Sequence, residues 1–595
     1  MDLRVQKRTA ELLYYLLTQK NEEAARIPFT PGKLLLAQEM PQSSRLERAT
    51  PESQGVRSAY IQQFLEELEQ DPRMHPHSVL VLRHGYVIAE KDYAPYSSEL
   101  WHVTHSLCKS LTGMAIGLLI DEGLLSLDDK LVKIFADQAS PITLLRQSAI
   151  TVRHLLTMTS GVVYNEAASV TEEHWVRGYL ESAVRGVLGE SFQYNSMNTY
   201  MLSAIVCRIT GRSMSDYLSE KLLEPMGIRR FYWECCPDGI EKGGWGLYMT
   251  PEDMAKLGLL MLQKGRYNGQ QLLSEEWVAA ASSKQVDTPV DSTPYGYGYQ
   301  IWMGEEPGSF QFNGMLGQNV LVFPAKDMVV VNTAGSRELE ARNGLALTME
   351  KFFGVGYEPT AEALPEDVEA NRKLRQACVC PAGRENFQRA LMCRRQERQR
   401  GKALRHSGGR NLSAGLRLLC GKAYEAGEKD NKPTLLPVFM QAMQNNYAPG
   451  VRRMSFESVS GAFYVVMNTG AEEYRLRVGL EHGCKQKLRI RGEVYWISVQ
   501  GEFTQNEDHI LVLKLRICFL ECSNERHIKI YLQPDGIQTR WSEVPGPEMI
   551  LDALDVVAGA GSGLMNSLIS KMDPGFFVYR LQKTLSPELY FNAVE

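Results

Sequence analysis

The stretch His105-Ser106-Leu107-Cys108-Lys109-Ser110-Leu111-Thr112-Gly113 opens an apolar segment that ends around Gly123. We predict a helix over this segment. Residues three apart share a helix face, so the amine of Lys109 would lie beside the hydroxyl of Ser106. A serine hydroxyl attacks a carbonyl only when a neighbouring base removes its proton. The positive field of a helix N-terminus disfavours an ammonium ion and stabilises an oxyanion. The spacing alone also fits a capped helix with a solvated lysine.

Two later segments follow in a recognisable order. Phe192-Gln193-Tyr194-Asn195-Ser196-Met197-Asn198-Thr199-Tyr200 precedes an apolar helix, and Phe312-Asn313-Gly314 lies on a predicted strand beside Met315. With the Ser106 segment, they resemble the serine β-lactamase and penicillin-binding-protein superfamily. The closest branch holds class C β-lactamases, D-amino-acid peptidases and related esterases and amide hydrolases.

Further segments extend this resemblance along the chain. Ile150–Gly161 looks like the family's loop after its first helical stretch, and Gly243–Met254 looks like the segment before its second large helix. The matching segments run from about His77 to Phe353 in the family's order. The resemblance therefore implies the fold of this family over that part of the chain.

The resemblance also implies roles for three side chains. Ser106 would be the acylated nucleophile and Lys109 its proton acceptor. Tyr194 would be the tyrosine of the family's Tyr-x-Asn or Tyr-x-Ser element and would exchange a proton with Ser106 or the leaving group. An unperturbed phenol has a pKa of about 10, so this role needs a cation nearby. We expect neither a metal nor an organic cofactor.

Other residues would surround the substrate. Ser196 and Asn198 both follow Tyr194, and either one could bind Lys109 or a substrate amide. The family's oxyanion hole uses two backbone amides, which here would be those of Ser106 and Met315. The strand residues Asn313 and Gly314 lead into Met315 and complete the expected substrate and oxyanion site.

The third motif departs from the family. Most β-lactamases and carboxypeptidases carry Lys-Thr-Gly or His-x-Gly on this strand, with a cation that faces the substrate carboxylate. Here the motif is Phe312-Asn313-Gly314. Loss of a charge-assisted hydrogen bond argues against penicillins or D-Ala-D-Ala peptides as natural substrates. Arg337 could replace the cation, although a solvent-exposed arginine at a helix start is the better explanation.

The remaining segments predict an α/β (α+β) architecture. A helix with one apolar face covers Ala59–Gln70, and a hairpin turns at Arg83-His84-Gly85. Short strands begin at Tyr295, and a closing helix covers Glu338–Phe353. From Phe456 onward, alternating apolar and polar residues predict a second, antiparallel β-rich part.

We therefore divide the chain into four parts. Residues 61–357 would form a β-lactamase/transpeptidase-like serine hydrolase domain, with an antiparallel sheet flanked by helices and an all-helical subdomain. The other parts are a helical N-terminal lead-in (1–60), a basic linker (358–415) and a C-terminal antiparallel β-rich domain (416–595).

Composition limits the class of protein. Apolar residues make up 44% of the 595 positions, enough for a sizeable core. The net charge is −5, from 65 basic and 70 acidic residues, so we expect neither a nucleic-acid nor a membrane partner. The basic stretch 372–410 has only Phe387 as an aromatic residue, which is typical of a solvated linker.

The opening residues lack the long apolar run of a secretory signal, and the 11 cysteines lack zinc-site spacing. We expect a soluble, cytoplasmic protein and make no prediction of its oligomeric state.

These features predict a serine hydrolase that acts on an ester or small amide through an acyl-enzyme. One alternative is a β-lactamase or D-amino-acid peptidase that acts on cell-wall fragments. Another is a binding protein that keeps the fold without turnover, but the presence of Ser106, Lys109 and Tyr194 together argues against it.

Overall fold

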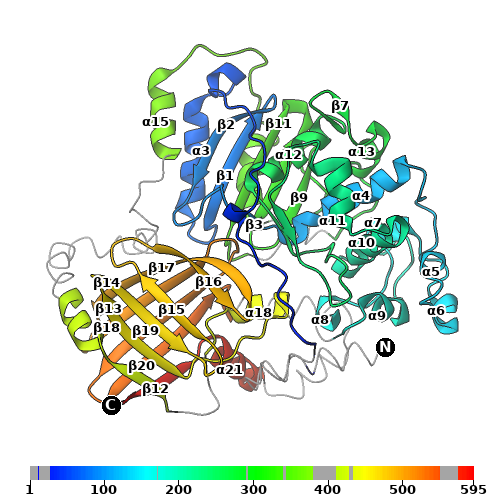
Figure 1. The fold of residues 1–595 in the computed structure, drawn as a ribbon. Helices are drawn as coiled ribbons and strands as arrows, with labels where there is room; N and C mark the ends of the chain where they lie inside the picture. The colour runs from blue at the N-terminus through cyan, green and yellow to red at the C-terminus, as the bar shows by residue number, and fades with distance from the viewer. Residues whose placement is uncertain are drawn as a thin grey trace. The chain divides into compact units, whose positions relative to one another are not determined.

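The structure is a computed structural model of the chain. It describes residues 27–169, 172–289, 293–338, 343–378, 411–427, 433–547 and 574–594, together with Glu11 and Met549. The described residues form two compact units (Figure 1). Unit 1 holds residues 37–378, and unit 2 combines residues 27–36 with the described residues from 411 onward.

Unit 1 is built around a six-stranded antiparallel sheet with the order β2-β1-β11-β10-β9-β8. The strands are β1 (Pro76–Arg83), β2 (Tyr86–Asp92), β8 (Trp302–Met303), β9 (Phe310–Gly314), β10 (Gln318–Phe323) and β11 (Met328–Ala334). The predicted hairpin between β1 and β2 is confirmed, because Arg83 pairs with Tyr86 across a two-residue turn. Both turn residues, His84 and Gly85, have positive φ, as a twisted hairpin requires.

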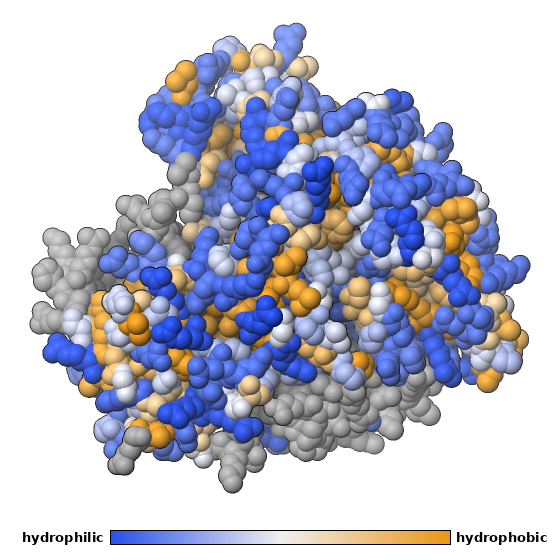
Figure 2. Space-filling model, viewed as in Figure 1, coloured by the Kyte–Doolittle hydropathy of each residue, from blue (hydrophilic) through white to orange (hydrophobic). Residues whose placement is uncertain are grey.

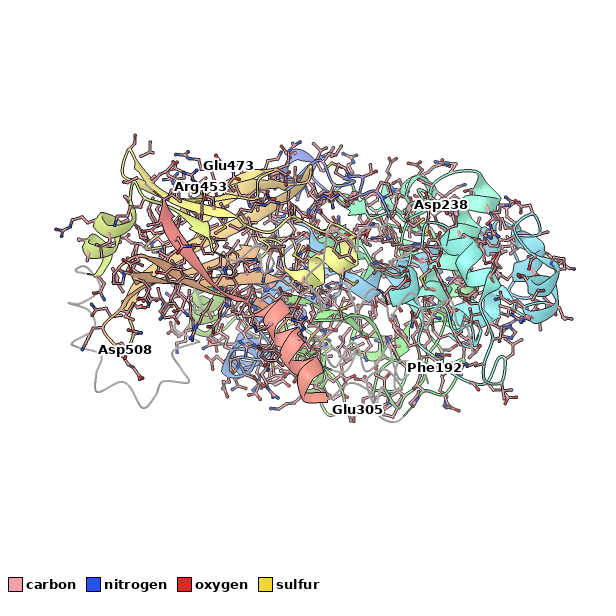
Figure 3. All side chains as sticks on the ribbon, turned by 90° about the horizontal axis from the view of Figure 1, so that it is seen from below. Phe192, Asp238, Glu305, Arg453, Glu473 and Asp508 are labelled. Carbon is pink, nitrogen blue, oxygen red and sulfur yellow. The ribbon has the colours of Figure 1, made fainter. Side chains whose placement is uncertain are left out.

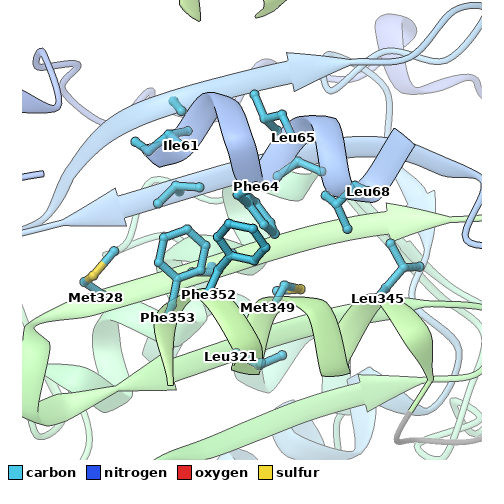
Figure 4. Packing of buried hydrophobic residues seen from close by; sticks show 14 of the residues in the cluster. Ile61, Phe64, Leu65, Leu68, Leu321, Met328, Leu345, Met349, Phe352 and Phe353 are labelled. Atoms are coloured by element: carbon cyan, nitrogen blue, oxygen red, sulfur yellow. The ribbon is translucent and has the colours of Figure 1, made fainter. Parts of the chain in front are cut away.

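Two helices cover one face of this sheet. They are α3 (Ser58–Gln70) and α14 (Gly344–Phe353), and their apolar side chains meet those of the strands (Figure 4). The apolar positions predicted for the first helix are confirmed as buried: Ile61, Phe64, Leu65 and Leu68. Phe64 packs edge-on against Phe353, with 4.9 Å between the ring centroids.

Helix α12 (Pro251–Leu262) covers the opposite face. A Cβ on Gly258 would lie only 2.8 Å from Val329 and 2.9 Å from Val320, so this helix rests directly on the strands. Because side chains alternate along a strand, Val320 faces α12 while its neighbour Leu321 joins the cluster under α3. The same alternation places Phe312, which pairs with Val320, on the α12 side of the sheet.

The remaining helices of unit 1 form the predicted helical region. The longest are α4 (Cys108–Asp121) and α10 (Ser196–Thr210). The shorter ones are α5 (Leu131–Ile134), α6 (Pro141–Arg146), α7 (Val152–Leu156), α8 (Glu166–Ser169), α9 (Trp175–Glu181), α11 (Met214–Leu218) and α13 (Glu275–Ala281). A small sheet of β3 (His102–Val103), β5 (Leu247–Met249) and β4 (Phe231–Trp233) leads into α4, and β6 (Arg266–Tyr267) pairs with β7 (Gln270–Gln271).

The flanking segments of the hydrolase unit are described in part. Within the predicted helical lead-in, residues 27–57 have mostly no regular structure, with two 3-10 turns, Ala37–Glu39 and Glu52–Gln54, and residues 12–26 lie outside the described part of the chain. Four prolines in this stretch remove backbone donors and oppose a helix: Pro28, Pro31, Pro41 and Pro51. The predicted linker begins with a packed helix, α15 (Val368–Cys378), whose Leu374 is buried in the cluster under α3. Residues 379–410 lie outside the described part of the chain.

Unit 2 is the predicted C-terminal antiparallel β-rich part. Its ten strands follow the order β15-β14-β13-β12-β21-β20-β19-β18-β17-β16. Gly479, after β15, bridges to Gln500 in β17, so the sheet is nearly closed into a barrel. The strands are β12 (Ala423–Ala426), β13 (Arg453–Val459), β14 (Ala462–Asn468), β15 (Glu473–Val478), β16 (Cys484–Ile490), β17 (Glu493–Gln505), β18 (Leu511–Phe519), β19 (Glu525–Gln533), β20 (Gly536–Val544) and β21 (Glu588–Val594). The helices α18 (Val438–Gln444) and α21 (Pro574–Leu585) accompany them, and residues 411–419 are helical as well.

The interior of unit 2 contains two buried ion pairs. Arg526 and Glu543 meet at 2.8 Å, and Glu543 also accepts hydrogen bonds from the first backbone amides of α18, those of Val438 and Phe439. Lys33 and Glu521 meet at 2.8 Å, with side chains that are 1% and 2% exposed. A buried charge is tolerated only when it is paired and hydrogen-bonded, so both pairs fix the geometry around them.

Lys33 belongs to the N-terminal strap, which we define as residues 27–36. The backbone amides of Gly32 and Lys33 donate to the carboxylate of Glu493 at 2.9 and 3.0 Å. In return, the amide of Val494 donates to the carbonyl of Lys33 at 3.0 Å. The strap is therefore an integral part of unit 2, although the chain passes through unit 1 before the barrel begins.

Polar residues cover most of the face seen in Figure 2, with hydrophobic residues scattered among them. Among the described residues, no helix combines the length and the apolar character needed to cross a membrane.

Candidate active site

The predicted helix after His105 is confirmed. A 3-10 turn, His105–Leu107, leads directly into α4. The turn is anchored by Thr104, whose backbone amide and hydroxyl both donate to the carbonyl of Leu247 in β5, at 2.8 and 3.0 Å. His105 adopts a φ of 48°, which is uncommon for a residue other than glycine. This left-handed residue turns the chain so that Ser106 stands at the start of the helix, where its side chain remains partly exposed.

Lys109 is the centre of the site. Its side chain is buried, and its Nζ lies 2.8 Å from Ser106 Oγ, 2.8 Å from Ser196 Oγ and 2.7 Å from the carbonyl oxygen of Gly244. A carbonyl can only accept, so Nζ always donates one proton to Gly244. Each hydroxyl can either accept from Nζ or donate to it. Both the ammonium and the neutral amine therefore find three partners here, and a proton can move between Ser106 and Lys109 without breaking the network.

Gly244 is a site residue that sequence reasoning missed. A Cβ on Gly244 would lie 2.6 Å from the carbonyl oxygen of Ser196 and 2.8 Å from Ser196 Cβ. A Cβ on Gly243 would be 2.8 Å from Ser203 Cβ. Only glycine lets this loop approach α10 closely enough for the Gly244 carbonyl to reach Lys109. The available signal was the Gly-Gly pair itself, within a segment that already resembled the family.

The structure distinguishes between the two candidates after Tyr194. Ser196, the first residue of α10, points its hydroxyl at Lys109. Asn198 does not reach Lys109. Its side-chain oxygen instead accepts from Ser160 Oγ at 2.7 Å and from the hydroxyl of Tyr179 at 2.6 Å. The structure therefore brings Ser196, not Asn198, to Lys109, because residues two apart point to different sides of a helix. Binding of substrate by Asn198 stays a prediction.

Tyr194 meets Lys109 through its ring. The Nζ of Lys109 lies 4.8 Å from the ring centroid, a cation–π distance, and the side chain of Tyr194 is 37% exposed. Among the described contacts, no hydrogen bond joins the Tyr194 hydroxyl to Ser106 or Lys109. Asn195, the next residue, caps α10 by accepting from the amide of Met197 at 2.9 Å, which fixes the chain where Tyr194 leaves it.

The third motif lies at the end of β9. A Cβ on Gly314 would lie 2.1 Å from the carbonyl oxygen of Thr104, so the strand passes directly against the backbone that precedes the Ser106 turn. Met315 follows as the first residue of the turn between β9 and β10. This approach brings the backbone at Met315 close to the start of the nucleophile turn, where the sequence placed the second oxyanion donor.

Asn313 has a different environment from the one expected. Its side-chain amide donates to Asn319 at 2.9 Å, Asn319 donates to Asn332 at 3.0 Å, and Asn332 donates to the carbonyl of Gly317 at 2.7 Å. This ladder crosses β9, β10 and β11 on the sheet face that α3 and α14 cover. Strand alternation turns Asn313 to the face opposite Phe312, where this ladder holds its side chain; contact of Asn313 with substrate stays a prediction.

Among the described residues, the structure does not bring Arg337 to the third motif as a substitute cation. Phe312 is buried on the α12 side of the sheet. Arg337 is exposed just after β11, and its backbone amide donates to the carbonyl of Arg73.

Electrostatic effects keep the neighbours of Ser106 uncharged. Burial, together with the charges of His102 and Lys109, lowers the pKa of the His105 imidazole from 6.5 to about 3. Burial raises the pKa of the Cys108 thiol from 9.0 to about 12. Cys108 therefore stays a thiol, and its Sγ donates to the carbonyl of Gly243 at 3.3 Å. Ser106 Oγ lies within hydrogen-bond distance of Lys109 Nζ, whereas Cys108 stays protonated and is a poor nucleophile.

Comparison with known proteins agrees with this geometry. The family described as Beta-lactamase matches residues 59–346. This part of the chain is therefore similar to the beta-lactamase family. A curated relative, 6-aminohexanoate-dimer hydrolase of Paenarthrobacter ureafaciens, is 29% identical over 329 residues, which is 50% of this chain and 83% of the relative.

Solved structures of similar β-lactamase-family proteins include a penicillin-binding-protein homologue from Caulobacter crescentus. It has a TM-score of 0.41 and 16% identity, and the match covers 49% of this chain and 94% of that structure. A family VIII carboxylesterase has a TM-score of 0.42 and 13% identity, and the match covers 51% of this chain and 97% of that structure. The family match and the hydrolase relative show a serine hydrolase that is similar to the beta-lactamase family.

Proposed function

We propose that this hydrolase cleaves uncharged esters or small amides through an acyl ester on Ser106. The observation that carries the proposal is the buried amine of Lys109, 2.8 Å from Ser106 Oγ and bonded in addition to Ser196 and Gly244. A serine and a base within hydrogen-bond reach, with the base held by further groups, is the arrangement that activates a nucleophile.

The first half of the reaction forms the acyl-enzyme. Ser106 Oγ bonds to the substrate carbonyl carbon while its proton passes to Lys109 Nζ. The carbonyl oxygen becomes an oxyanion, and the backbone amides of Ser106 and Met315 stabilise it. Collapse breaks the bond to the leaving group, which takes a proton from the phenol of Tyr194. Lys109 then returns a proton to Tyr194, with the ring beside its cation throughout.

The second half releases the acid. Water attacks the acyl carbon and gives its proton to the Lys109–Ser196 pair, a second oxyanion forms in the same backbone site, and its collapse returns the proton to Ser106 Oγ. The net reaction consumes one water and yields the acid and the alcohol or amine. The three partners of Lys109 satisfy its hydrogen bonds in both protonation states, so neither half requires them to rearrange.

The substrate class follows from the third motif. Phe312 occupies the position at which most β-lactamases and carboxypeptidases carry a cation. Its ring is buried on the face of the sheet that α12 covers. A substrate carboxylate would find no charged partner at this position. The relative named 6-aminohexanoate-dimer hydrolase supports a small amide as the bond that is cleaved.

Labelling with a fluorophosphonate probe tests the proposal. We expect one adduct, mapped by mass spectrometry to Ser106, absent in Ser106→Ala and slowed at least about 100-fold in Lys109→Met. Ser148→Ala, which alters an exposed serine of the same unit, should label like the unaltered protein. An adduct at another residue, or none, would contradict the mechanism. Faster hydrolysis of a chromogenic cephalosporin than of nitrophenyl esters would favour a β-lactamase or D-amino-acid peptidase.

We further propose a cytoplasmic location and a division into a hydrolase domain over 61–357 and a β-rich domain over 416–595. Nine described cysteines are present as thiols, the form that a reducing compartment maintains. The grouping of the described residues into two compact units supports the division.

A further inference from the structure

We propose that Trp302 is a positioning residue that holds the ring of Tyr194 against Lys109. This inference rests on the proposed function, because it concerns how the side chains of that site are kept in place. Tyr194 precedes the N-cap of α10, outside any helix or strand, and more than a third of its side chain is exposed. The backbone alone therefore does not determine where its ring lies.

The indole of Trp302 supplies the missing constraint. It stacks on Tyr194 with 5.4 Å between ring centroids and 22° between ring planes. The Tyr194 ring thus contacts the cation of Lys109 and the indole of Trp302 at the same time. A stacked aromatic pair contributes about 0.5–1.5 kcal/mol beyond its buried area and restricts the tilt of each ring.

Trp302 is itself firmly held. Only 6% of it is exposed, and its indole packs edge-on against Tyr297 with 4.7 Å between centroids. The ring of Phe192, which is labelled in Figure 3, packs edge-on against the same indole with 5.7 Å between ring centroids. Trp302 also starts β8 and pairs with Gln311 of β9, so its backbone is part of the main sheet.

Gln300, two residues earlier, ties this segment to the helices of the site. The carbonyl of Gln300 accepts from Ser110 Oγ of α4 at 2.8 Å, and its side-chain oxygen accepts from Thr199 Oγ1 of α10 at 2.6 Å. Its side-chain nitrogen donates to the carbonyls of Leu155 and Leu156 at 3.1 and 2.9 Å. The segment that carries Trp302 is therefore fixed to the helix of Lys109 and to the helix of Ser196.

These contacts connect Trp302 to the chemistry through Tyr194. When the indole is present, the ring of Tyr194 stays beside Lys109 and its hydroxyl stays within a narrow range of positions. When the indole is removed, the exposed ring gains conformers that leave the cation, and only a fraction of molecules are arranged for proton transfer. The loss should appear in kcat rather than in KM, because substrate contacts are not removed.

The test compares Trp302→Leu, Trp302→Phe and the matched control Trp277→Leu. Trp277 is also a buried tryptophan of unit 1 stacked on a tyrosine, Tyr299, at 5.4 Å, but it does not contact Tyr194. We expect Trp302→Leu to lower kcat for an alkyl ester, whose alkoxide leaving group needs the proton of Tyr194, about 10-fold, the equivalent of one aromatic pair, with KM within about 3-fold. Trp302→Phe should restore kcat to within about 3-fold of the unaltered protein. Trp277→Leu should lower the melting temperature as much as Trp302→Leu while kcat stays within about 3-fold.

A second comparison shows whether the effect passes through Tyr194. Trp302→Leu should lower kcat for the alkyl ester in the unaltered chain but not in a Tyr194→Ala background. Equal losses of kcat in Trp302→Leu and Trp277→Leu would overturn the inference, as would an undiminished effect of Trp302→Leu in the Tyr194→Ala background. If Ser106 were not labelled in the unaltered protein, the proposed function itself would fail, so the two failures are distinguishable.

Discussion

Lys109 shows how a single residue can serve a reaction in two charge states. Its three partners include one obligatory acceptor, Gly244, and two hydroxyls that can reverse direction. Because every arrangement of the protons leaves the same number of hydrogen bonds, movement of a proton does not leave a buried polar atom without a partner. The residue-scale predictions concern the side chains around this amine.

The neighbours Ser196 and Asn198 should separate activity from stability. Ser196→Ala removes a hydrogen-bond partner of Lys109, and we expect kcat to fall about 100-fold with little change in melting temperature. Asn198→Ala leaves the buried hydroxyls of Ser160 and Tyr179 without their acceptor, and we expect a loss of about 1–3 kcal/mol in unfolding free energy. Ester hydrolysis and thermal denaturation of both variants measure these effects. The reverse pattern would show that Asn198, not Ser196, serves the reaction.

His105 should make unit 1 sensitive to acid. Its folded-state pKa lies near 3, below the usual 6.5, so the unfolded chain binds its proton more readily between these values. The contribution to unfolding free energy is complete above about pH 6.5 and declines as pH falls, by about 2 kcal/mol at pH 5.

Urea denaturation at pH 7.5 and pH 5 tests whether the unfolding free energy falls as the pH is lowered. The unaltered protein should lose more stability between the two pH values than His105→Gln, which cannot take up the proton. Identical losses in the two proteins would show that other groups account for the acid sensitivity.

Elements of the fold differ in how far the sequence reveals them. The turn at His84-Gly85 and the apolar face of Ala59–Gln70 are encoded within a few residues, and both were predicted. The spacing of Ser106 and Lys109 likewise depends only on helix geometry. The orientation of Asn313 depends on strand register, and the carbonyl of Gly244 depends on how a loop packs against α10. Such features require long-range contacts that no local pattern carries.

The loop at Gly243-Gly244 gives the prediction at this scale. Gly244→Ala would force a Cβ to within 2.6 Å of the Ser196 carbonyl, so the loop must shift and its own carbonyl must leave Lys109. We expect kcat to fall about 100-fold, the usual cost of a displacement near 1 Å in a catalytic group.

Gly546→Ala is the matched control, since the nearest atom to its Cβ would be 3.8 Å away. Steady-state kinetics of both variants measure how much the Gly244 carbonyl contributes to kcat. A Gly244→Ala enzyme with kcat within about 3-fold of the control would show that the carbonyl is dispensable.

At the scale of the whole molecule, unit 2 is assembled from distant parts of the sequence. The strap joins the barrel through Lys33, Glu493 and Glu521. A division into consecutive segments cannot anticipate this arrangement, because nothing local in Pro28–Leu36 indicates a partner several hundred residues away. The prolines indicate only that the strap is not a helix.

Removing the charge of Lys33 should loosen the barrel. Lys33→Met leaves the buried carboxylate of Glu521 without its cation, and we expect unit 2 to lose about 3–5 kcal/mol of unfolding free energy. Lys33→Met with Glu521→Leu should recover most of this loss, because neither charge remains buried. Hydrogen exchange of the amides in β17 and β18 measures the loss of stability in the single variant and its recovery in the double variant.

Lys264→Met provides the control, because it breaks a solvent-exposed pair with Glu275 in unit 1 and should cost less than about 1 kcal/mol. If exchange in β17 and β18 responded as little to Lys33→Met as to Lys264→Met, the strap would not stabilise the barrel.

The docking of the strap also sets an order of events during synthesis. Lys33 and Glu493 are 460 positions apart. At ribosomal rates of about 5–20 residues per second, Glu493 leaves the ribosome roughly half a minute to a minute and a half after Lys33. For that time the strap has no docking surface and is open to proteases and chaperones. The strap is therefore protected only after the residues that it docks against, such as Glu493, have been synthesised.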